Sequence, residues 1–277
     1  MLWKIYENHW KILMVLPIIL LVVSVVILAA TYVSTGYFVP RGTEFQGGKT
    51  ITIPVDNVDL ETVKEAVPYG SVRLSFGAEK TLLVEIPSDR NETEVVETLK
   101  GVVQFTGEPS IKIIGPVVAQ IFFQQAQTAL VVAFIFMAVV VSLLFRSPAP
   151  AAAVIFAAVV DIVATMAVMN VLDIRLSFPV LAALLTIIGY SVDTDILLTT
   201  EMLKGDREKE KENIQRAMKT GLTLTATALV ALLSLYFLSG SAVLEEIASV
   251  LIIGLLIDMP ATWFTNAGLM RLWLRRK

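Results

Sequence analysis

The stretch Phe178–Leu203, FPVLAALLTIIGYSVDTDILLTTEML, decides the fold class of this chain. It is almost wholly apolar, and about 20 apolar residues in an α-helix suffice to cross the hydrocarbon core of a bilayer. Two acids, Asp193 and Asp195, nevertheless stand in its second half. A helix of this length that keeps acids in its apolar interior is typical of a membrane protein with a functional site between its helices.

Five further apolar runs reach the length of a membrane span, at 12–33, 127–145, 150–172, 221–238 and 243–270. The first is longer than the core of a signal peptide, about 7–15 residues, so we interpret it as an uncleaved anchor. The composition agrees, because 56% of the 277 residues are hydrophobic and only 17% are charged. Soluble domains carry about 25% charged residues. We therefore predict a polytopic α-helical membrane protein with six transmembrane helices.

The segment from about 40 to 115 differs from the rest, because it mixes charged, polar and apolar residues. Alternating or short continuous apolar runs predict strands at 51–55, 72–76, 81–86 and 111–113. Apolar residues at helical spacing predict two helices, at 60–67 and 95–102, with Asp59 and Asn91 as N-caps. The resulting order, β-α-β-β-α-β, predicts a small α+β domain of the ferredoxin-like type.

Basic residues predict how the chain sits in the cell membrane. Lys and Arg gather in the loop 204–219 and in the tail 275–277, and Arg146 follows the second span, whereas only Arg175 lies between the third and fourth spans. The positive-inside rule then places both termini and the charged loop in the cytoplasm. We accordingly expect three parts: 1–35 with the first span, an extracytoplasmic domain at 36–118, and 119–277 with spans two to six.

Several classes of function are disfavoured by composition. A net charge of −3 provides no basic face for nucleic acid. Cysteine is absent and His9 is the single histidine, so cysteine-based metal and nucleophile sites are excluded and we expect no metal. The sequence contains no phosphate-binding P-loop, which disfavours nucleotide hydrolysis by this chain. We expect neither an enzyme nor a bound cofactor.

Four acids inside the predicted spans are the strongest functional signal: Asp161, Asp193, Asp195 and Asp258. A central Asp costs roughly 2.5–3.5 kcal/mol on membrane-insertion scales, so each needs a compensating role. One interpretation is a proton relay, since burial favours the neutral carboxyl and a group poised near neutrality can load and release protons. The alternative is a neutral, hydrogen-bonded acid that only holds helices together.

Asp193 and Asp195 cannot both face one point, because two residues along a helix are about 200° apart around its axis. We favour Asp193 as the central acid, because it lies deeper and follows Gly189-Tyr190-Ser191, where a small residue permits close approach of another helix. Asp195 and Asp161 are then expected to have milder roles.

Four motifs in order along the chain carry a resemblance to a known family: Glu44-Phe45-Gln46-Gly47-Gly48 after the first span, Ile114-Gly115-Pro116-Val117 before the second, Leu144-Phe145-Arg146 at its end, and Ile188-Gly189-Tyr190-Ser191-Val192-Asp193-Thr194-Asp195 in the fourth. Together with six spans and one outer domain, they resemble the SecF family of protein-export subunits, within the RND-type transporter superfamily.

The resemblance implies a SecD-like six-span partner, a neighbouring SecYEG-type channel, an exported polypeptide as substrate, and the proton gradient in place of a cofactor. This chain departs from many bacterial members, whose Gly-Tyr-Ser-x-Asn-Asp motif would set the acid at Thr194. Those members also have an Arg before a Thr/Ser-rich start of span five, where the nearest basic residue here is Lys219. Lys219 therefore joins the four acids as a relay candidate.

Two other functions fit the same topology. The chain could be an RND-like half-transporter of a lipid or small molecule, or a structural partner that steadies a channel without coupling ions. An outer domain of about 75 residues is small for collecting substrates, which favours export. Co-purification of a SecD-like protein would distinguish these alternatives.

Overall fold

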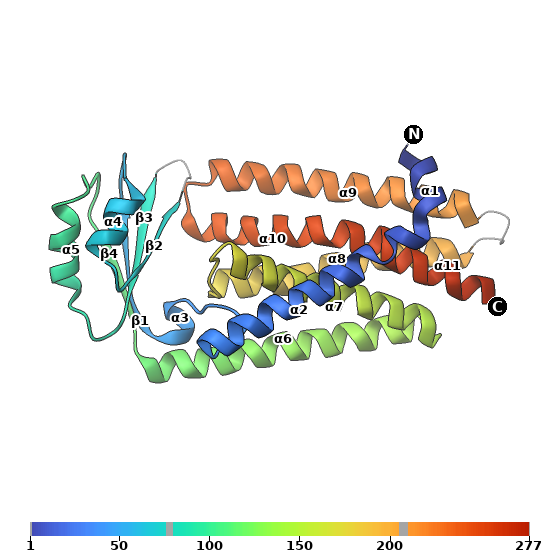
Figure 1. Cartoon of the computed structure of the whole chain (residues 1–277), viewed down its shortest axis with the longest axis horizontal. Coiled ribbons are helices and arrows are strands. Elements are labelled where there is room, and N and C mark those ends of the chain that lie inside the picture. The colour runs from blue at the N-terminus through green and yellow to red at the C-terminus, as the bar shows by residue number, and fades with distance from the viewer. Residues whose placement is uncertain (1, 76–79, 205–209, 277) are drawn as a thin grey trace.

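The structure is a computed structural model that describes residues 2–75, 80–204 and 210–276. Figure 1 shows an elongated molecule, with a helical bundle along its length and a small sheet at one end. Both chain termini lie at the other end of the bundle, away from the sheet.

The bundle is built from helices that run along its length (Figure 1). Their bounds are α2 Leu16–Thr35, α6 Pro116–Phe145, α7 Pro148–Val171, α8 Phe178–Lys204, α9 Glu210–Leu238 and α10 Ala242–Pro260. The short helix α1 Leu2–Leu13 lies across the end of the bundle that holds the termini. A π-helical segment, η2 Ala261–Asn266, follows α10 directly and leads into α11 Ala267–Arg276.

Five helices within the described ranges are long and apolar enough to cross a membrane: Glu7–Thr35, Pro116–Phe145, Pro148–Val171, Phe178–Leu203 and Glu210–Leu238. The predicted sixth span, 243–270, is a helix in three parts, and α10 alone contains Glu245, Glu246 and Asp258. Three acids within 19 residues set α10 apart from the five helices above.

The sheet domain follows the predicted order of elements. It contains the short helix α3 Thr43–Gln46, then β1 Gly48–Pro54, α4 Leu60–Ala66, β2 Ser71–Ser75, β3 Thr81–Ile86, α5 Glu92–Lys100 and β4 Ser110–Ile114. The strands lie in the order β2-β3-β1-β4, and every neighbouring pair is antiparallel. The register pairs Ile51 of β1 with Val84 of β3 on one side and Ile111 of β4 on the other.

Both predicted N-caps are confirmed. The Asp59 side chain accepts a hydrogen bond from the backbone N–H of Glu61, and the Asn91 side chain accepts one from Thr93. The second helix begins and ends earlier than predicted, because α5 starts at Glu92, directly after its cap, and ends at Lys100 with Gly101 at its C-cap, which leaves Val102 outside. Phe76, predicted at the end of the second strand, lies outside the described residues.

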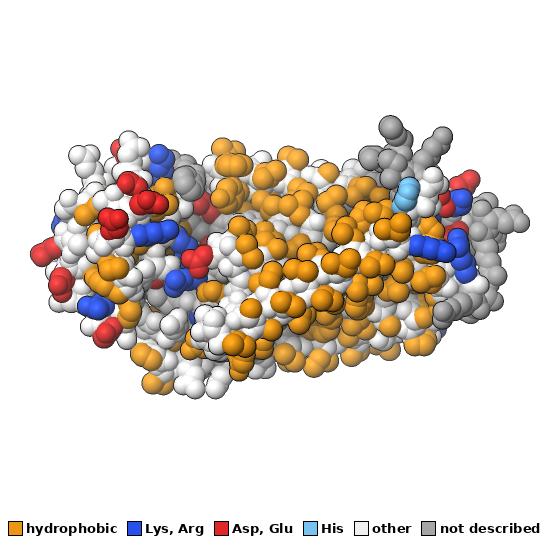
Figure 2. Space-filling view, viewed as in Figure 1, with side chains coloured by type: hydrophobic (Ala, Val, Ile, Leu, Met, Phe, Trp, Pro, Cys, Tyr) orange, Lys and Arg blue, Asp and Glu red, His pale blue; other side chains and the backbone are white. Residues whose placement is uncertain are grey.

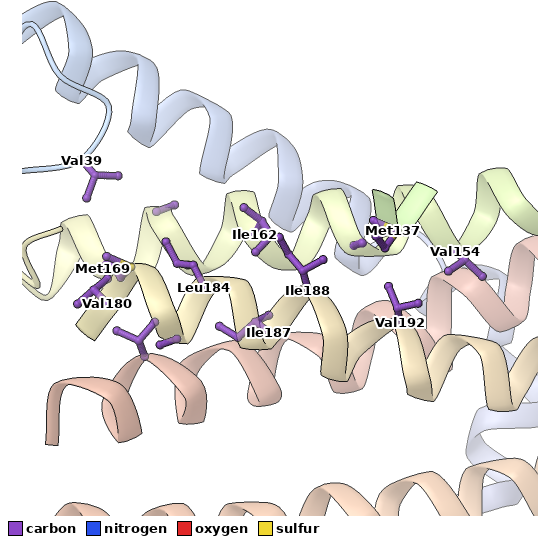
Figure 3. Packing of buried hydrophobic residues seen from close by; sticks show 14 of the residues in the cluster. Val39, Met137, Val154, Ile162, Met169, Val180, Leu184, Ile187, Ile188 and Val192 are labelled. Atoms are coloured by element: carbon purple, nitrogen blue, oxygen red, sulfur yellow. The ribbon is translucent and has the colours of Figure 1, made fainter. Parts of the chain in front are cut away.

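Each half of the molecule has its own hydrophobic core. In the sheet domain, Ile51, Leu82 and Leu99 are fully buried between the sheet and its helices. In the bundle the core centres on α7 and α8, where Ile162, Leu184 and Ile187 pack together (Figure 3). The outer surface of the bundle is apolar in the view of Figure 2, and charged side chains gather at its two ends. That distribution matches the hydrocarbon layer and its two polar boundaries.

The alternating charges of 204–219 favour a solvated helical face, and the structure agrees, because the part of this connection from Glu210 onward is helical. Residues 205–209 lie outside the described residues, but α9 begins at Glu210 and continues through the whole fifth apolar run. Glu210 pairs with the buried Arg271 at 3.2 Å, and Lys211 pairs with Glu7 at 3.2 Å. The alternating charges therefore form a helical face at the end of the bundle that holds the termini.

Candidate functional site

Three of the four predicted acids meet at one buried site between three helices. Asp161 comes from α7, Asp195 from α8 and Asp258 from α10, and each is at most 1% exposed. The three helices pack closely against one another along the core of the bundle. We call these three carboxyl groups the acid cluster.

Hydroxyl and amide groups hold the acid cluster in place. Ser191 Oγ donates a hydrogen bond to Asp161 Oδ2, and Asn266 Nδ2 donates one to Asp195 Oδ1 at 2.7 Å. Thr194 Oγ1 lies 3.2 Å from Asp258 Oδ2 and 2.8 Å from the backbone carbonyl oxygen of Ser191. The acids are thus surrounded by polar partners, although they are remote from solvent.

Thr262 joins two of the acids through one hydroxyl group. Its Oγ1 lies 2.9 Å from Asp195 Oδ1 and 3.0 Å from Asp258 Oδ1. A threonine hydroxyl has one hydrogen to donate, and an ionised carboxylate can only accept. With both carboxylates ionised, the single hydrogen of Thr262 is shared between two acceptors, whereas a proton on Asp258 could be donated to Thr262 and leave the threonine hydrogen to Asp195. A proton on this pair of acids would give each contact its own hydrogen.

The π-helical segment presents the linking groups. Thr262 and Asn266 both belong to η2, which begins just after Pro260. Proline has no N–H to bond the carbonyl four residues earlier, so it disrupts the α-helical pattern at this point. Sequence reasoning missed both residues, although Asp258, Thr262 and Asn266 are spaced four apart and form a polar stripe along one helix face.

The acid cluster also has unused hydrogen-bonding capacity. Within residues 2–75, 80–204 and 210–276, Asp161 Oδ1, Asp195 Oδ2 and Asn266 Oδ1 are buried without a hydrogen-bond partner. Over the same ranges, no group of three His, Cys, Asp or Glu side chains is arranged to hold a metal ion. These unpartnered oxygens can therefore accept further hydrogen bonds.

Asp193 does not join the acid cluster, which corrects the prediction that it is the inward-facing acid. Its side chain is exposed on the outer face of α8, while Asp195 faces inward with 0% exposure. Gly189 lies on the same outer face, and a methyl group there would meet no atom within 4 Å. Tyr190 is partly buried, and Lys219 is exposed on α9 away from the acids.

A second group of predicted residues meets where the sheet domain joins the bundle, and we call this region the joint. The Phe45 ring packs edge-on against Phe178 and Phe123, with centroids 5.0 Å and 6.1 Å apart. Glu44 pairs with Lys112 at 2.9 Å and also accepts a hydrogen bond from the backbone N–H of Phe178. This motif therefore connects β4, α6 and α8.

The glycine pair of the same motif makes the joint compact. Gly48 has φ +139°, and a Cβ atom there would lie 2.6 Å from the carbonyl oxygen of Ile86. A Cβ atom on Gly47, with φ +83°, would lie 3.0 Å from Cα of Pro116. Gly115 is the N-cap of α6 and Pro116 its first residue, so two of the motifs are in contact. Arg146 is exposed at the far end of the same helix, where it forms the C-cap.

Ion pairs tie the sheet domain to α10. Arg73 of β2 pairs with Glu246 of α10 at 2.9 Å and with Glu85 of β3 at 3.0 Å, and Arg175 pairs with Glu85 at 3.3 Å. Burial alone would lower the pKa of Arg73, but Glu85 and Glu246 outweigh it and raise that pKa. Ser75 adds a hydrogen bond to Glu245. A cavity of about 640 Å³ lies beside these contacts, between β2 and the adjoining ends of α9 and α10.

Comparisons with known proteins agree on one family. The family described as "Protein export membrane protein SecD/SecF, C-terminal" matches residues 94–276. A relative from Pyrococcus furiosus, named protein-export membrane protein SecF, is 38% identical over 98% of this chain and 93% of its own length. A relative of the same name from Methanocaldococcus jannaschii is 35% identical and covers 96% of each chain.

One solved structure shows the same fold. The crystal structure of SecDF from Thermus thermophilus, a translocon-associated membrane protein, superimposes with a TM-score of 0.78 at 20% identity. The match covers 98% of this chain and 38% of the longer SecDF chain.

Proposed function

Since this chain belongs to the SecF family of protein-export membrane proteins, we propose that it couples the proton gradient to export through its acid cluster. It is a multi-pass membrane protein that takes part in protein export. The observation that carries the coupling proposal is the single Thr262 hydroxyl between Asp195 and Asp258, which has one hydrogen for two acids, so that a proton on the pair would complete the hydrogen bonding. A hydrogen-bonded site that already holds one proton can pass protons on.

In this proposal, a proton on Asp258 determines which hydrogen bonds join α8 to α10 and η2. With Asp258 protonated, its hydroxyl hydrogen is donated to Thr262, which in turn donates to Asp195 of α8. Loss of that proton leaves two carboxylates competing for one threonine hydrogen, and like charges in an apolar interior repel strongly. We propose that this repulsion moves α10 and η2 relative to α8.

Helix α10 provides a direct mechanical link to the sheet domain. Asp258 lies 12 residues after Glu246, which corresponds to about 18 Å along an α-helix. Glu246 holds Arg73 and Glu245 accepts from Ser75, so the first turn of α10 is fastened to β2. A shift of α10 would therefore be transmitted to the sheet domain without any intermediate element.

The proposed arrangement in the membrane has six spans, with α10, η2 and α11 together forming the sixth. It places residues 36–118 outside the cell as a ferredoxin-like domain and both termini in the cytoplasm. Two observations support it. Both termini lie at the end of the bundle opposite the sheet (Figure 1), and the segment 210–219 at the start of α9 carries basic residues.

We propose a SecD-like subunit as the partner, seated on the outer face of α8. Gly189 leaves open space for another helix, and Asp193 exposes an acid on the same face, which a membrane helix tolerates best against a protein partner. The longer SecDF chain, of which this chain spans 38%, supports the presence of such a partner. The complex would act beside a SecYEG-type channel on an exported polypeptide.

The proposal is tested with Asp258→Asn in the assembled complex, in vesicles with and without an imposed proton gradient. Asn keeps the shape and one hydrogen-bond acceptor but cannot titrate. We expect export without a gradient to persist and its stimulation by the gradient to disappear. Asp56→Asn, an exposed acid of the outer domain, is the matched control and should behave like the wild type.

Full gradient stimulation in Asp258→Asn, with the complex assembled, would reduce the acid cluster to a structural role. Failure of the variant to assemble would be resolved by Asp195→Asn, whose side chain would keep a carbonyl acceptor for Asn266.

A further inference from the structure

A polar cavity of about 380 Å³ lies in the joint, separate from the acid cluster. Cationic, hydroxyl and carboxyl groups line it, among them Arg41, Thr43, Tyr69, Ser71, Glu85 and Arg175. Two cations and one carboxylate in this group leave a surplus of positive charge. Nothing in the coupling proposal uses this cavity.

Arg41 is held in a fixed position without an acidic partner. Its guanidinium carbon lies 3.9 Å from the ring centroid of Tyr37 and 3.5 Å from that of Phe123, so two aromatic rings fix its plane. Among the residues that the structure describes, no Asp or Glu forms an ion pair with it. Burial lowers the pKa of Arg41, as expected for a cation that lacks a counter-ion.

Arg175 supplies a second donor to the same cavity. Its Nη1 reaches Glu85 at 3.3 Å, but its Nε is buried and has no hydrogen-bond partner in the described part of the chain. Glu85 is also held by Arg73, so its single charge is shared between two guanidinium groups. The Arg175 guanidinium group is therefore only partly neutralised by the protein around it.

The backbone fixes the two arginines beside each other. Gly42 N donates to the carbonyl oxygen of Leu176 at 2.8 Å, and Leu176 N donates to the carbonyl oxygen of Pro40 at 2.8 Å. Arg41 and Arg175 therefore come from two paired segments. Their spacing is set by these hydrogen bonds before any ligand arrives, which reduces the ordering cost of binding.

We propose that this cavity binds a negatively charged phosphate group, as carried by a lipid headgroup or by inorganic phosphate. Guanidinium groups match phosphate oxygens in charge and in the geometry of paired hydrogen bonds. The position favours a lipid, because Phe123 belongs to α6, a helix long enough to cross the membrane, and lies near its start. Lipid phosphates lie at that depth, where the hydrocarbon layer ends.

Bound phosphate would act on the joint. It would bridge the segment after α2, through Arg41, to the segment between α7 and α8, through Arg175. Gln46 and Gly47 of the motif near the start of the sheet domain line the same cavity. The ligand would thus stiffen the connection between the sheet domain and the bundle.

The test uses the full chain in mild detergent and counts bound ligand by native mass spectrometry during titration. The probes are short-chain phosphatidylglycerol, which is anionic, short-chain phosphatidylcholine, which has no net charge, and inorganic phosphate. We expect phosphatidylglycerol to bind about tenfold more tightly than phosphatidylcholine. Arg41→Gln should lose about tenfold in affinity for phosphatidylglycerol, the scale of one hydrogen bond to a charged group.

Lys80→Gln, which removes an exposed cation of the same domain, is the matched control and should bind like the wild type. If Arg41→Gln unfolds, Arg41→Lys keeps the charge but loses the planar group, and should still weaken binding. Displacement of phosphatidylglycerol by millimolar inorganic phosphate would identify free phosphate as sufficient, and resistance to it would identify the lipid.

Equal binding of the two lipids, or equal affinity in the wild type and both Arg41 variants, would overturn the proposal. Tighter binding of an acidic peptide than of either phosphate probe would do the same, because the cavity would then recognise a polypeptide. The readout involves neither a proton gradient nor export, so it can fail while the coupling proposal stands.

Discussion

At the scale of single residues, the position of one hydroxyl group decides what the acid cluster can do. Thr262 lies between carboxyl oxygens of α8 and α10 and has one hydrogen for two acceptors. The same segment, η2, also carries Asn266, which donates a hydrogen bond to Asp195. Each acid of the acid cluster therefore has at least one hydrogen-bond partner. Such fixed contacts allow a change of one proton to alter the contact between two helices.

Thr262→Val should reduce stimulation of export by the proton gradient several-fold, while the complex still assembles. Valine has a similar shape but no hydroxyl, so the two acids lose their shared link, at a cost of about 1–3 kcal/mol for unsatisfied buried groups. The measurement is export in vesicles with and without a gradient. Thr223→Val is the control, because that hydroxyl is exposed and bonds only its own helix at Lys219. Equal losses in both variants would contradict the assignment.

Substitution by alanine should change the stability of the chain in opposite directions at two glycines. Gly48→Ala would place Cβ 2.6 Å from a backbone oxygen, at a φ of +139° that favours glycine, and should destabilise the chain by about 1–3 kcal/mol. Gly189→Ala lies in a helix with open space and should be neutral or stabilising by up to about 1 kcal/mol. Thermal unfolding of the isolated chain in detergent measures both. A neutral Gly48→Ala would mean that the joint adjusts easily.

At the scale of elements, α10 is the part that connects the two halves of the molecule. Its first turn holds β2 through Glu245 and Glu246, and its later turns carry Asp258 to the acid cluster. Pro260 and the π-helical segment lie just beyond Asp258, so the regular helix ends at the acid cluster. Irregular segments of this kind are frequent at functional sites in helices.

Arg73→Gln should loosen the sheet domain from the bundle. The change removes the guanidinium charge that Glu246 and Glu85 share. The buried carboxylate of Glu85 and the half-buried carboxylate of Glu246 then lose this cationic partner. We expect faster amide hydrogen exchange in β2 and the first turn of α10, with unchanged exchange in α5. Lys100→Gln, on the exposed end of α5, is the control. Unchanged exchange at β2 would show that Ser75 and the backbone contacts suffice.

The N-cap of α4 should stabilise its helix in a pH-dependent way. Hydrogen bonds from Thr62 and Glu61 lower the pKa of Asp59 below its ordinary value. Because the folded pKa is the lower one, the cap's contribution is present above the unfolded pKa and is lost as the pH falls through the folded pKa. The difference in melting temperature between the wild type and Asp59→Ala should therefore shrink on acidification. If the difference in melting temperature stayed the same at every pH, the charge of Asp59 would be excluded as the source of the cap's stabilisation.

At the scale of the whole molecule, charge and hydropathy define two polar ends and an apolar middle (Figure 2). The end with the sheet domain carries the ion pairs of Arg73 and Arg175, and the opposite end carries those of Arg271 and Lys211. Arg271 is fully buried and joins Glu7 of α1 to Glu210 of α9. This arrangement fastens both termini to one end of the bundle.

Cysteine labelling of intact cells tests the proposed orientation. Lys80→Cys, in the sheet domain, should react with an impermeant reagent, and Glu212→Cys, at the start of α9, should be protected until the membrane is opened. The residues lie at opposite ends of the bundle, so one experiment tests both sides. The reverse labelling pattern would invert the orientation and remove any role in pulling a polypeptide outward.

The sequence by itself determined the membrane class, the order of elements in the sheet domain and both of its helix caps. These features depend on local properties, namely the length of apolar runs, their period and the residues at their ends. The four motifs also placed the chain in its family before any packing was known.

Only the tertiary structure decided which acids meet. Asp193 and Asp195 are equally acidic and two residues apart, and the neighbours of α8 select Asp195 for the interior. That selection depends on how α7 and α10 pack around α8, which no spacing within α8 encodes. The same holds for Thr262 and Asn266, since a π-helical turn after Pro260 sets their direction. A helix fixes the angle between its own side chains, but its rotation in the bundle is set by contacts with other helices.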